Sequence, residues 1–158
     1  MAYSNRELLA RIIMCEAGGE GENGMKAVAT VIMNRATIET GEYFRVSEGG
    51  NIRNIIMQKG QFTCSMETIG SSYNTQNIYN MNPTQEHYDI ADWALSGNKL
   101  NEVSDCLWFM NPFKKSCPAK FPYNGTGYLM TKINNHCFFS PTSKYMILSK
   151  YWRELVYE

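Results

Sequence analysis

The spacing of the hydrophobic residues changes along the chain, and this change constrains the fold more than any other feature. As far as Gly97, apolar residues recur every three or four positions, which is typical of amphipathic helices. From Cys106 onward they form short runs and alternations, which are typical of strands. A chain of 158 residues has room for one domain. We therefore expect a single α+β domain over residues 1–158, with helices first and a small antiparallel sheet afterwards.

The first predicted helix, over residues 4–16, has clear signals at both ends. Ser4 can cap it, Glu7 completes an S-x-x-E capping box, and a glycine-rich turn ends it. The last predicted helix of the first part is expected to begin with Asn82 as its cap and Pro83 in its first position. In all, the helical periodicity of this part predicts three further helices, over residues 25–36, 52–58 and 82–97.

The remaining stretches are predicted from weaker signals. Residues 37–51 lack periodicity and are expected to be irregular. Residues 68–81, which are rich in Ser, Asn and Tyr, are expected to form a long loop or a substrate-facing arm. An apolar run over residues 106–110, stopped by an Asn-Pro pair, predicts a buried strand. Alternating apolar residues predict two further strands, over residues 128–130 and 132–139, and the tail, residues 143–158, is expected to form a closing helix.

The charge composition excludes several classes of partner. Lys plus Arg is 15 and Asp plus Glu is 15, so the net charge is zero, and no basic run stands out. We therefore expect neither nucleic-acid binding nor attachment to a membrane surface. No stretch reaches the roughly 18 apolar residues needed to span a bilayer. The N-terminus lacks the basic and apolar regions of a signal peptide, which predicts synthesis in the cytoplasm without a leader.

The cysteines show no pattern that predicts a disulfide framework or a zinc site. Their number is odd, they are widely spread, and no C-x-x-C pair occurs. Because cytoplasmic synthesis keeps thiols reduced, we expect buried, reduced cysteines, and neither a metal nor a cofactor. The five positions are Cys15, Cys64, Cys106, Cys117 and Cys137.

Glu16 is the most informative acidic residue, because it continues the apolar stripe of the first helix after Ile12 and Ile13. Burial disfavours a charged carboxylate, and the negative end of the helix dipole opposes it as well, so both effects are expected to raise its pKa. A raised carboxyl pKa suits a general acid at neutral pH. The glycines that follow would let a polymer approach the backbone closely. The alternative role for Glu16 is to cap the helix or to pair with an arginine.

Four short blocks occur in a fixed order over about residues 8–142, and together they resemble one family. The blocks are Glu16-Ala-Gly-Gly-Glu20 followed by Asn34-Arg35, then Gly60-Gln61-Phe62, then Leu107-Trp-Phe-Met-Asn111-Pro112, and finally Ile133-Asn-Asn-His136-Cys-Phe138-Phe139. This order resembles the spore cortex-lytic cell-wall hydrolases of the SleB/CwlJ family. Cys117, Cys137 and the missing signal peptide resemble the CwlJ branch of that family more closely.

The resemblance implies a lysozyme- or transglycosylase-like fold and an enzyme that acts on peptidoglycan during spore germination. The implied reaction is cleavage of the glycan strand by a lytic transglycosylase, which leaves 1,6-anhydro-muramic ends. Glu16 is the implied catalytic acid, and the first helix selects the same residue. Glu20 is the second acid of the block, and it is a candidate for a base or for ordering the turn. The implied location is the spore coat or cortex surface, with a spore-coat assembly protein as a further partner.

The candidate substrate-binding residues lie in the other blocks. Phe62 and Trp108 can stack on sugar rings, although both residue types are common in an ordinary core. Gln61 and Asn111 are polar neighbours of these aromatics and suit contacts with acetamido or hydroxyl groups. His136 lies in an apolar strand, where it either contacts substrate or forms a hydrogen-bonded part of the core.

Two hypotheses of other classes remain open. Cys15 or Cys64 together with His136 can form a Cys/His amidase or peptidase that acts on stem peptides. Cys15 lies at the C-terminus of the first predicted helix, where the negative end of the helix dipole raises rather than lowers the pKa of a thiol. This position argues against Cys15 as the nucleophile. The other hypothesis is a non-catalytic module that binds muropeptides or the spore coat, and the intact Glu16 argues against it.

Overall fold

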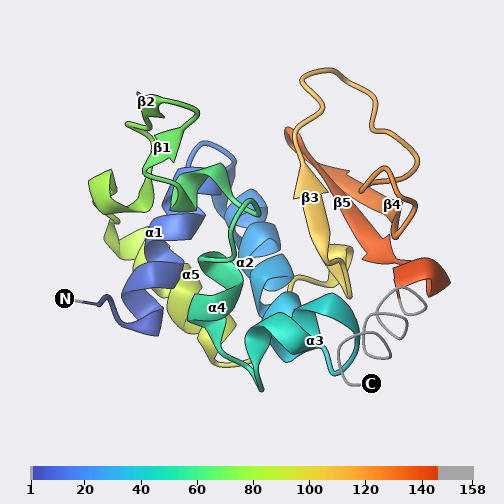
Figure 1. The fold of residues 1–158 in the computed structure, drawn as a ribbon, viewed down its shortest axis with the longest axis horizontal. Helices are drawn as coiled ribbons and strands as arrows, with labels where there is room; N and C mark the ends of the chain where they lie inside the picture. The colour runs from blue at the N-terminus through green and yellow to red at the C-terminus, as the bar shows by residue number, and fades with distance from the viewer. Residues whose placement is uncertain (1, 146–158) are drawn as a thin grey trace.

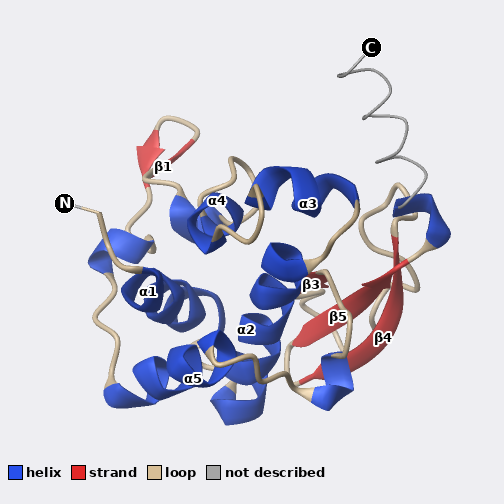
Figure 2. Ribbon diagram, turned by 90° about the horizontal axis from the view of Figure 1, so that it is seen from below, coloured by secondary structure: helices blue, strands red, loops and turns tan. Residues whose placement is uncertain are grey.

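The helical first part of the chain packs against one side of a small sheet (Figure 1). The computed structural model describes residues 2–145. Helix α2, Gly21–Thr37, runs through the middle, with the other helices on one side and the sheet on the other (Figure 2). Most of the predicted closing helix lies outside the described residues, and residues 143–145 are helical.

Helix α1, Asn5–Ala17, begins after its cap Ser4 as the sequence predicts, but only the Ser4 half of the predicted capping box is formed. The hydroxyl oxygen of Ser4 accepts a hydrogen bond from the backbone N–H of Glu7, at 3.1 Å. The carboxylate of Glu7 is bound by Arg11 and by Tyr88. The apolar stripe of the helix is buried, and it consists of Leu8, Leu9, Ile12 and Ile13. Burial of this stripe supplies most of the free energy that holds α1 on the core.

Helix α2 begins four residues earlier than the prediction of 25–36, because the glycine-rich turn becomes its first turn. Gly21 opens the helix with a φ of 73°, a conformation that glycine adopts without strain. A Cβ on Gly24 would lie 2.5 Å from the Cβ of Glu20, so a side chain at position 24 would collide with the residue before the helix. The glycines therefore bring Glu20 and the start of α2 close to the end of α1.

The stretch 37–51 was expected to be irregular, and this prediction is wrong. It contains helix α3, Gly41–Ser47, which is too short to show a clear periodicity. The N–H of Tyr43 in α3 binds the hydroxyl of Tyr145, at 3.1 Å, so α3 is fixed to the end of the described chain. Helix α4, Ile52–Ile56, ends two residues before the predicted end of 52–58.

The stretch 68–81, expected to form a long loop or a substrate-facing arm, carries a short antiparallel hairpin. Its strands are β1, Thr68–Ile69, and β2, Ser72–Tyr73. The rest of this arm is held by side chains that bind backbone groups, and the amide of Asn77 caps a single turn at Ile78–Asn80. Such local bonds replace regular structure in a segment rich in Asn and Ser.

Helix α5, Gln85–Leu95, starts later than predicted. Its cap is Thr84, not Asn82, and Pro83 lies before the helix. The Nδ1 atom of His87 accepts a hydrogen bond from the backbone N–H of Thr84, at 2.9 Å. His87 is therefore buried in a capping role.

The sheet has three antiparallel strands in the order β3-β5-β4. They are β3, Trp108–Met110, β4, Gly127–Ile133, and β5, His136–Pro141. The single strand predicted over 132–139 is wrong, because a tight turn through Asn134 and Asn135 divides it. Asn134 has a φ of 50°, which asparagine tolerates better than most residues.

The prediction of reduced cysteines is wrong for four of the five. Cys15 is bonded to Cys64, and Cys117 is bonded to Cys137, across separations of 49 and 20 residues. Cys106 is free and buried. Spacing along the chain could not reveal these pairs, because the fold brings their Cα atoms to 6.1 and 5.9 Å. No helix within residues 2–145 is long and apolar enough to cross a membrane.

Candidate active site

Glu16 lies in the last turn of α1, partly buried beneath the segment that follows α4. Removal from water raises the pKa of this carboxyl from 4.5 to about 7. The backbone N–H of Cys64 donates a hydrogen bond to the carboxylate, and the charge of Arg35 attracts it; both effects limit the rise in pKa. The side chain is thus available as a proton donor and, after ionisation, as a proton acceptor near neutral pH.

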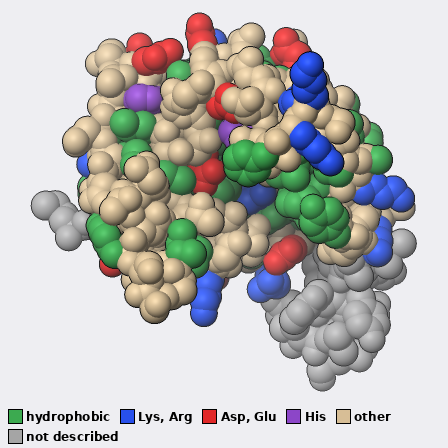
Figure 3. All heavy atoms as spheres, turned by 90° about the horizontal axis from the view of Figure 1, so that it is seen from above, with side chains coloured by type: hydrophobic (Ala, Val, Ile, Leu, Met, Phe, Trp, Pro, Cys, Tyr) green, Lys and Arg blue, Asp and Glu red, His purple; other side chains and the backbone are tan. Residues whose placement is uncertain are grey.

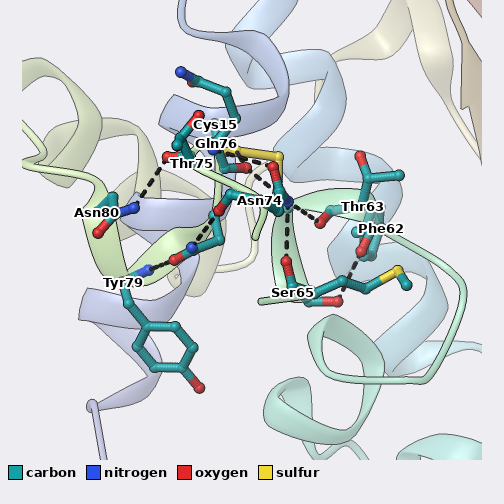
Figure 4. The surroundings of a disulfide bond; sticks show 12 residues. Cys15, Phe62, Thr63, Ser65, Asn74, Thr75, Gln76, Tyr79 and Asn80 are labelled. Atoms are coloured by element: carbon teal, nitrogen blue, oxygen red, sulfur yellow. Dashed lines mark hydrogen bonds between the residues drawn. A yellow bond between two sulfur atoms is a disulfide. The ribbon is translucent and has the colours of Figure 1, made fainter. Parts of the chain in front are cut away.

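The segment that covers Glu16 runs from Gln61 to Ser65 and is joined to α1 by the Cys15–Cys64 disulfide. It contains a single 3-10 turn, Thr63–Ser65. Figure 4 shows the disulfide next to the arm at Asn74, whose amide donates hydrogen bonds to the carbonyls of Thr63 and Met66, both at 2.9 Å. Glu16 is therefore enclosed by a segment with both covalent and hydrogen-bonded support.

Arg35 is the buried cation of the site. Its guanidinium carbon lies 4.6 Å from the centre of the Tyr43 ring and 5.0 Å from that of Phe62. Its Nε donates a hydrogen bond to the carbonyl of Leu107, at 2.6 Å, whereas its Nη1 has no hydrogen-bond partner among the described residues. Burial lowers the pKa of Arg35, and the charge of Glu16 is one of the influences that oppose this. Arg35 acts on Glu16 through its charge.

Glu20 is buried at the start of α2, where it joins the helices to the sheet. Its Oε2 accepts a hydrogen bond from the amide of Asn135, at 3.2 Å, and its backbone carbonyl accepts one from Asn134, at 2.5 Å. Its Oε1 lies 3.1 Å from Nδ1 of His136. Both carboxylate oxygens therefore have neighbours in the β4–β5 hairpin.

His136 is buried at the start of β5, packed edge-on against Phe109 with ring centres 5.2 Å apart. Its Nδ1 lies within ion-pair distance of Glu20 but makes no hydrogen bond to it, so the two groups form an ion pair only when the imidazole is protonated. Burial lowers the pKa of His136, and the charge of Glu20 partly offsets this. The geometry places His136 beside Glu20.

The two aromatic residues predicted to stack on sugars are both buried. Phe62 is 3% exposed and stacks on Phe109, with ring centres 6.1 Å apart. Trp108 is 6% exposed and meets Tyr145 edge to face, at 5.6 Å. In this structure both side chains shape the walls of the site from within and offer little free ring surface to a ligand.

The two amide side chains predicted to contact substrate, Gln61 and Asn111, differ in exposure and in hydrogen bonding. Gln61 is exposed, and its Oε1 accepts a hydrogen bond from the hydroxyl of Tyr43, at 3.0 Å. Asn111 is half-buried, and its Oδ1 binds the backbone N–H of Phe113, at 2.7 Å, which forms a local turn. Gln61 extends from the segment that also covers Glu16, whereas Asn111 stabilises the loop after β3.

The sequence did not identify the backbone of Cys64 or the ring of Tyr43 as parts of the site. A backbone donor leaves no signal in the sequence, and Tyr43 lies in a stretch without periodicity. The block Gly60-Gln61-Phe62 was the one available pointer, because Cys64 follows it closely. Within residues 2–145, no three side chains of His, Cys, Asp or Glu are grouped so that they could hold a metal ion.

Figure 3 shows the face of the molecule that carries the β1–β2 hairpin and one end of the sheet. Acidic and hydrophobic side chains meet in a hollow near its centre, and Lys and Arg side chains gather mainly on the side of the sheet. The loop after β3 exposes the aromatic rings of Phe113 and Tyr123 almost completely, at 90% and 83%.

The Cys/His hypothesis is not supported by the cysteine chemistry. Cys15 and Cys64 share a disulfide, so neither sulfur is a free thiolate that could attack a carbonyl. The free thiol, Cys106, is buried next to Ser140, and burial raises its pKa to about 11. A thiol of this kind is inert at neutral pH.

Comparisons with known proteins agree with the motifs. The sequence profile of a family described as Cell Wall Hydrolase matches residues 19–139, a stretch that includes Glu20 and begins after Glu16. The cell wall hydrolase CwlJ of Bacillus subtilis (strain 168) is 27% identical over 138 residues, which cover 87% of this chain and 86% of that protein. The CwlJ protein of Oceanobacillus iheyensis is 28% identical over 137 residues, which cover 87% of this chain and 86% of that protein.

Two solved structures share the fold. The catalytic domain of the Bacillus cereus SleB protein matches with a TM-score of 0.62 and 23% identity, over 88% of this chain and 93% of that one. The catalytic domain of the germination-specific lytic transglycosylase SleB from Bacillus anthracis matches with a TM-score of 0.62 and 22% identity, over 88% and 98%. The predicted α+β fold, with helices before a small antiparallel sheet, is thereby confirmed. Because the family profile covers well over half of its length, this chain belongs to the cell wall hydrolase family.

Proposed function

We propose that this chain cleaves the glycan strands of peptidoglycan as a lytic transglycosylase, with Glu16 as the acid and then the base. Membership of the cell wall hydrolase family makes it an enzyme that acts on peptidoglycan. The observation that supports a lytic transglycosylase mechanism through Glu16 is the state of this carboxyl, which is partly buried and has a pKa raised to about 7. A group with this pKa is protonated in a large share of molecules at neutral pH and ionises readily after it has given up its proton.

The reaction begins with Glu16 in its protonated form. Its proton passes to the glycosidic oxygen that follows N-acetylmuramic acid, the C1–O bond breaks, and the leaving oxygen keeps the electron pair. Positive charge develops at C1 and the ring oxygen of the muramic residue. The carboxylate of Glu16 then removes the proton of the C6 hydroxyl, and the C6 oxygen bonds to C1. The product is a 1,6-anhydro ring, no water is consumed, and Glu16 regains its proton.

The surroundings of Glu20 support a single catalytic carboxyl. A water-using glycosidase needs a second carboxylate to activate water or to attack C1. Both oxygens of Glu20 already face Asn135 and His136, and the side chain is 8% exposed. We assign Glu20 to ordering the turn between α1 and α2 and to holding the β4–β5 hairpin against it.

The proposed setting is the spore cortex during germination. Support comes from the relatives, since curated cell wall hydrolases named CwlJ match most of this chain and a structural neighbour is described as a germination-specific lytic transglycosylase. A spore-coat assembly protein and a position at the cortex surface belong to the same proposal.

Mass spectrometry of digested cortex tests the proposal. Purified spore cortex is treated with the native protein and with Glu16→Gln, and the muropeptides are compared. We expect anhydro-ended fragments, one water lighter than reducing-end fragments, from the native protein and none from the variant. Reducing-end fragments that disappear with the variant would mean that water, and not the C6 hydroxyl, attacks C1. Freed stem peptides would contradict cleavage of the glycan. Binding without any product would favour the non-catalytic module.

A further inference from the structure

The Cys15–Cys64 disulfide joins the two residues that flank the Glu16 carboxyl. Cys15 directly precedes Glu16 in α1, and the backbone N–H of Cys64 is the hydrogen-bond donor to that carboxyl. The two cysteines are separated by 49 residues, and helices α2, α3 and α4 lie between them. A covalent bond thus fixes the donor beside the acceptor from a distant part of the chain.

The segment that carries Cys64 has little regular structure of its own. A single 3-10 turn, Thr63–Ser65, is closed by the hydrogen bond from Ser65 to Phe62, at 3.1 Å. The bonds from Asn74 tie this turn to the arm at residues 74–80, not to α1 (Figure 4). The disulfide is therefore the covalent connection that fixes this turn to the last turn of α1, where Glu16 lies.

We propose that the Cys15–Cys64 disulfide is a redox-dependent positioning element for Glu16. When it is closed, it holds the N–H of Cys64 on the carboxyl and fixes the direction in which the carboxyl faces the substrate. When it is open, the turn at Cys64 moves away from α1, the hydrogen bond is lost, and the carboxyl rotates freely. The effect on turnover rests on the proposed function of Glu16, whereas the effect on the carboxyl itself does not.

Opening and closing are ordinary thiol–disulfide exchange. One thiol of a dithiol reductant attacks one sulfur, the S–S bond breaks, and a mixed disulfide between protein and reductant forms. The second thiol of the reductant then attacks this mixed disulfide and releases the remaining cysteine thiol. Cys15 and Cys64 gain two electrons and two protons, and the reductant becomes a cyclic disulfide. A small-molecule disulfide carries out the reverse exchange and closes the bond again. Reduced and oxidised forms of the same chain can therefore be compared directly.

The other charged groups near α1 remain in place when this disulfide opens. Arg35 reaches Glu16 from α2 and is held by the carbonyl of Leu107. Glu20, also on α2, is held by the β4–β5 hairpin. At the other end of α1, Arg6 pairs with Asp92 of α5. A change in the titration of Glu16 after reduction is therefore expected to come from the turn at Cys64, which both covers the carboxyl and donates a hydrogen bond to it.

The second disulfide provides a matched control. Cys117–Cys137 closes a shorter stretch of 20 residues and ties the loop after β3 to β5. Its removal is expected to lower thermal stability, as removal of the first one does, because both bonds restrict the unfolded chain. It does not touch Glu16 or the turn that carries the Cys64 donor, so it separates loss of stability from loss of positioning.

The experiment compares native protein, Cys15→Ala/Cys64→Ala and Cys117→Ala/Cys137→Ala. The Glu16 carboxyl is titrated by NMR without substrate, and glycan cleavage is measured against pH. In the first double variant we expect a lower pKa for Glu16, because the turn that covers the carboxyl moves away and water reaches it. The alkaline limb of activity should move to lower pH, and kcat should fall about 10- to 100-fold with KM little changed. Native protein treated with dithiothreitol should behave in the same way, and reoxidation should restore it.

The control variant should keep the native titration of Glu16 and the native alkaline limb, even though its melting temperature falls. A folded Cys15→Ala/Cys64→Ala protein with native titration and native kcat would overturn the proposal. If Glu16→Gln remains active, the proposed function fails instead. The titration of Glu16 without substrate still tests the positioning role in that case.

Discussion

The helical part and the sheet part of this protein carry opposite charge. Residues 1–105 contain thirteen Asp and Glu against eight Lys and Arg, whereas residues 106–145 contain five lysines and no Asp or Glu. Every carboxylate of the candidate site therefore comes from the helical part. The sheet supplies Asn135 and His136, which face Glu20, whereas Arg35 faces Glu16 from the helical part. The overall net charge of zero hides the difference in charge between the two parts.

The two parts meet through polar contacts at the candidate site. Glu20 of the helical part faces His136 and Asn135 of the sheet. Asn34 and Arg35 of α2 donate hydrogen bonds to backbone carbonyls at and just before the start of the sheet part. In the proposed mechanism, the helical part holds the proton donor, Glu16, and the sheet part holds Glu20 and Arg35 in place through these contacts.

The largest expected effect comes from removing the proton donor of the helical part. Glu16→Gln keeps the size and hydrogen-bonding capacity of the side chain but cannot transfer a proton. We expect kcat for glycan cleavage to fall by about 10²- to 10⁴-fold, the usual contribution of a general acid or base. Turnover is measured as release of muropeptides from cortex. Activity within a few-fold of native would move the chemistry away from the helical part.

The same substitution is expected to stabilise the protein at high pH. In the unfolded chain Glu16 ionises near pH 4.5, whereas in the fold its pKa is raised to about 7. The contribution of neutral Glu16 to the free energy of unfolding is therefore fully present below pH 4.5 and is lost as the pH rises through 7. Above pH 7, Glu16→Gln should unfold with a free energy about 2 kcal/mol higher than native protein. Chemical denaturation at pH 4 and pH 8 measures this, and an equal difference at both values would contradict it.

A smaller effect on activity is expected from Glu20, which connects the two parts. Glu20→Gln removes the charge near His136 but keeps a hydrogen-bond acceptor for Asn135. We expect a loss of stability of about 1 kcal/mol and a fall in kcat of less than about 10-fold. Thermal unfolding and the cortex assay are run on the same samples. A loss of activity as large as that of Glu16→Gln would make Glu20 a second catalytic group.

The smallest expected effect comes from the lysines of the sheet part. Lys114 and Lys115 are exposed beside Phe113 in the loop after β3. Stem peptides carry carboxylates, so Lys114→Ser/Lys115→Ser should raise KM about 2- to 5-fold at low salt. High salt should remove the difference, because exposed charges are screened. Lys99→Ser, an exposed lysine of the helical part, is the control and should leave KM unchanged.

The features that the sequence predicted well are local ones. The start of α1 at Ser4 follows from a capping pattern, and the partial burial of Glu16 follows from its place on the apolar stripe. The division into helices and sheet follows from the change of hydrophobic period. In each case the relevant residues lie within two turns of each other, so the pattern alone contains the information.

The features that it missed depend on contacts between distant residues. The disulfides join residues that only the fold brings together, and the separation of Cys15 from Cys64 is 49 residues. The turn at Asn134 and Asn135 was hidden because alternation continues across it. Phe62 and Trp108 were predicted as sugar contacts or as core residues, and both are buried. The sequence could not decide between these roles, because an aromatic residue in a motif has the same pattern in either place.

The most direct test of this account is the titration of the Glu16 carboxyl. Protein labelled with ¹³C at the glutamate carboxyl carbons is titrated by NMR, and the signal that disappears in Glu16→Gln identifies the residue. We expect that signal to titrate near pH 7 while exposed glutamates titrate near pH 4. A midpoint near pH 4 for Glu16 would contradict its assignment as the proton donor at neutral pH.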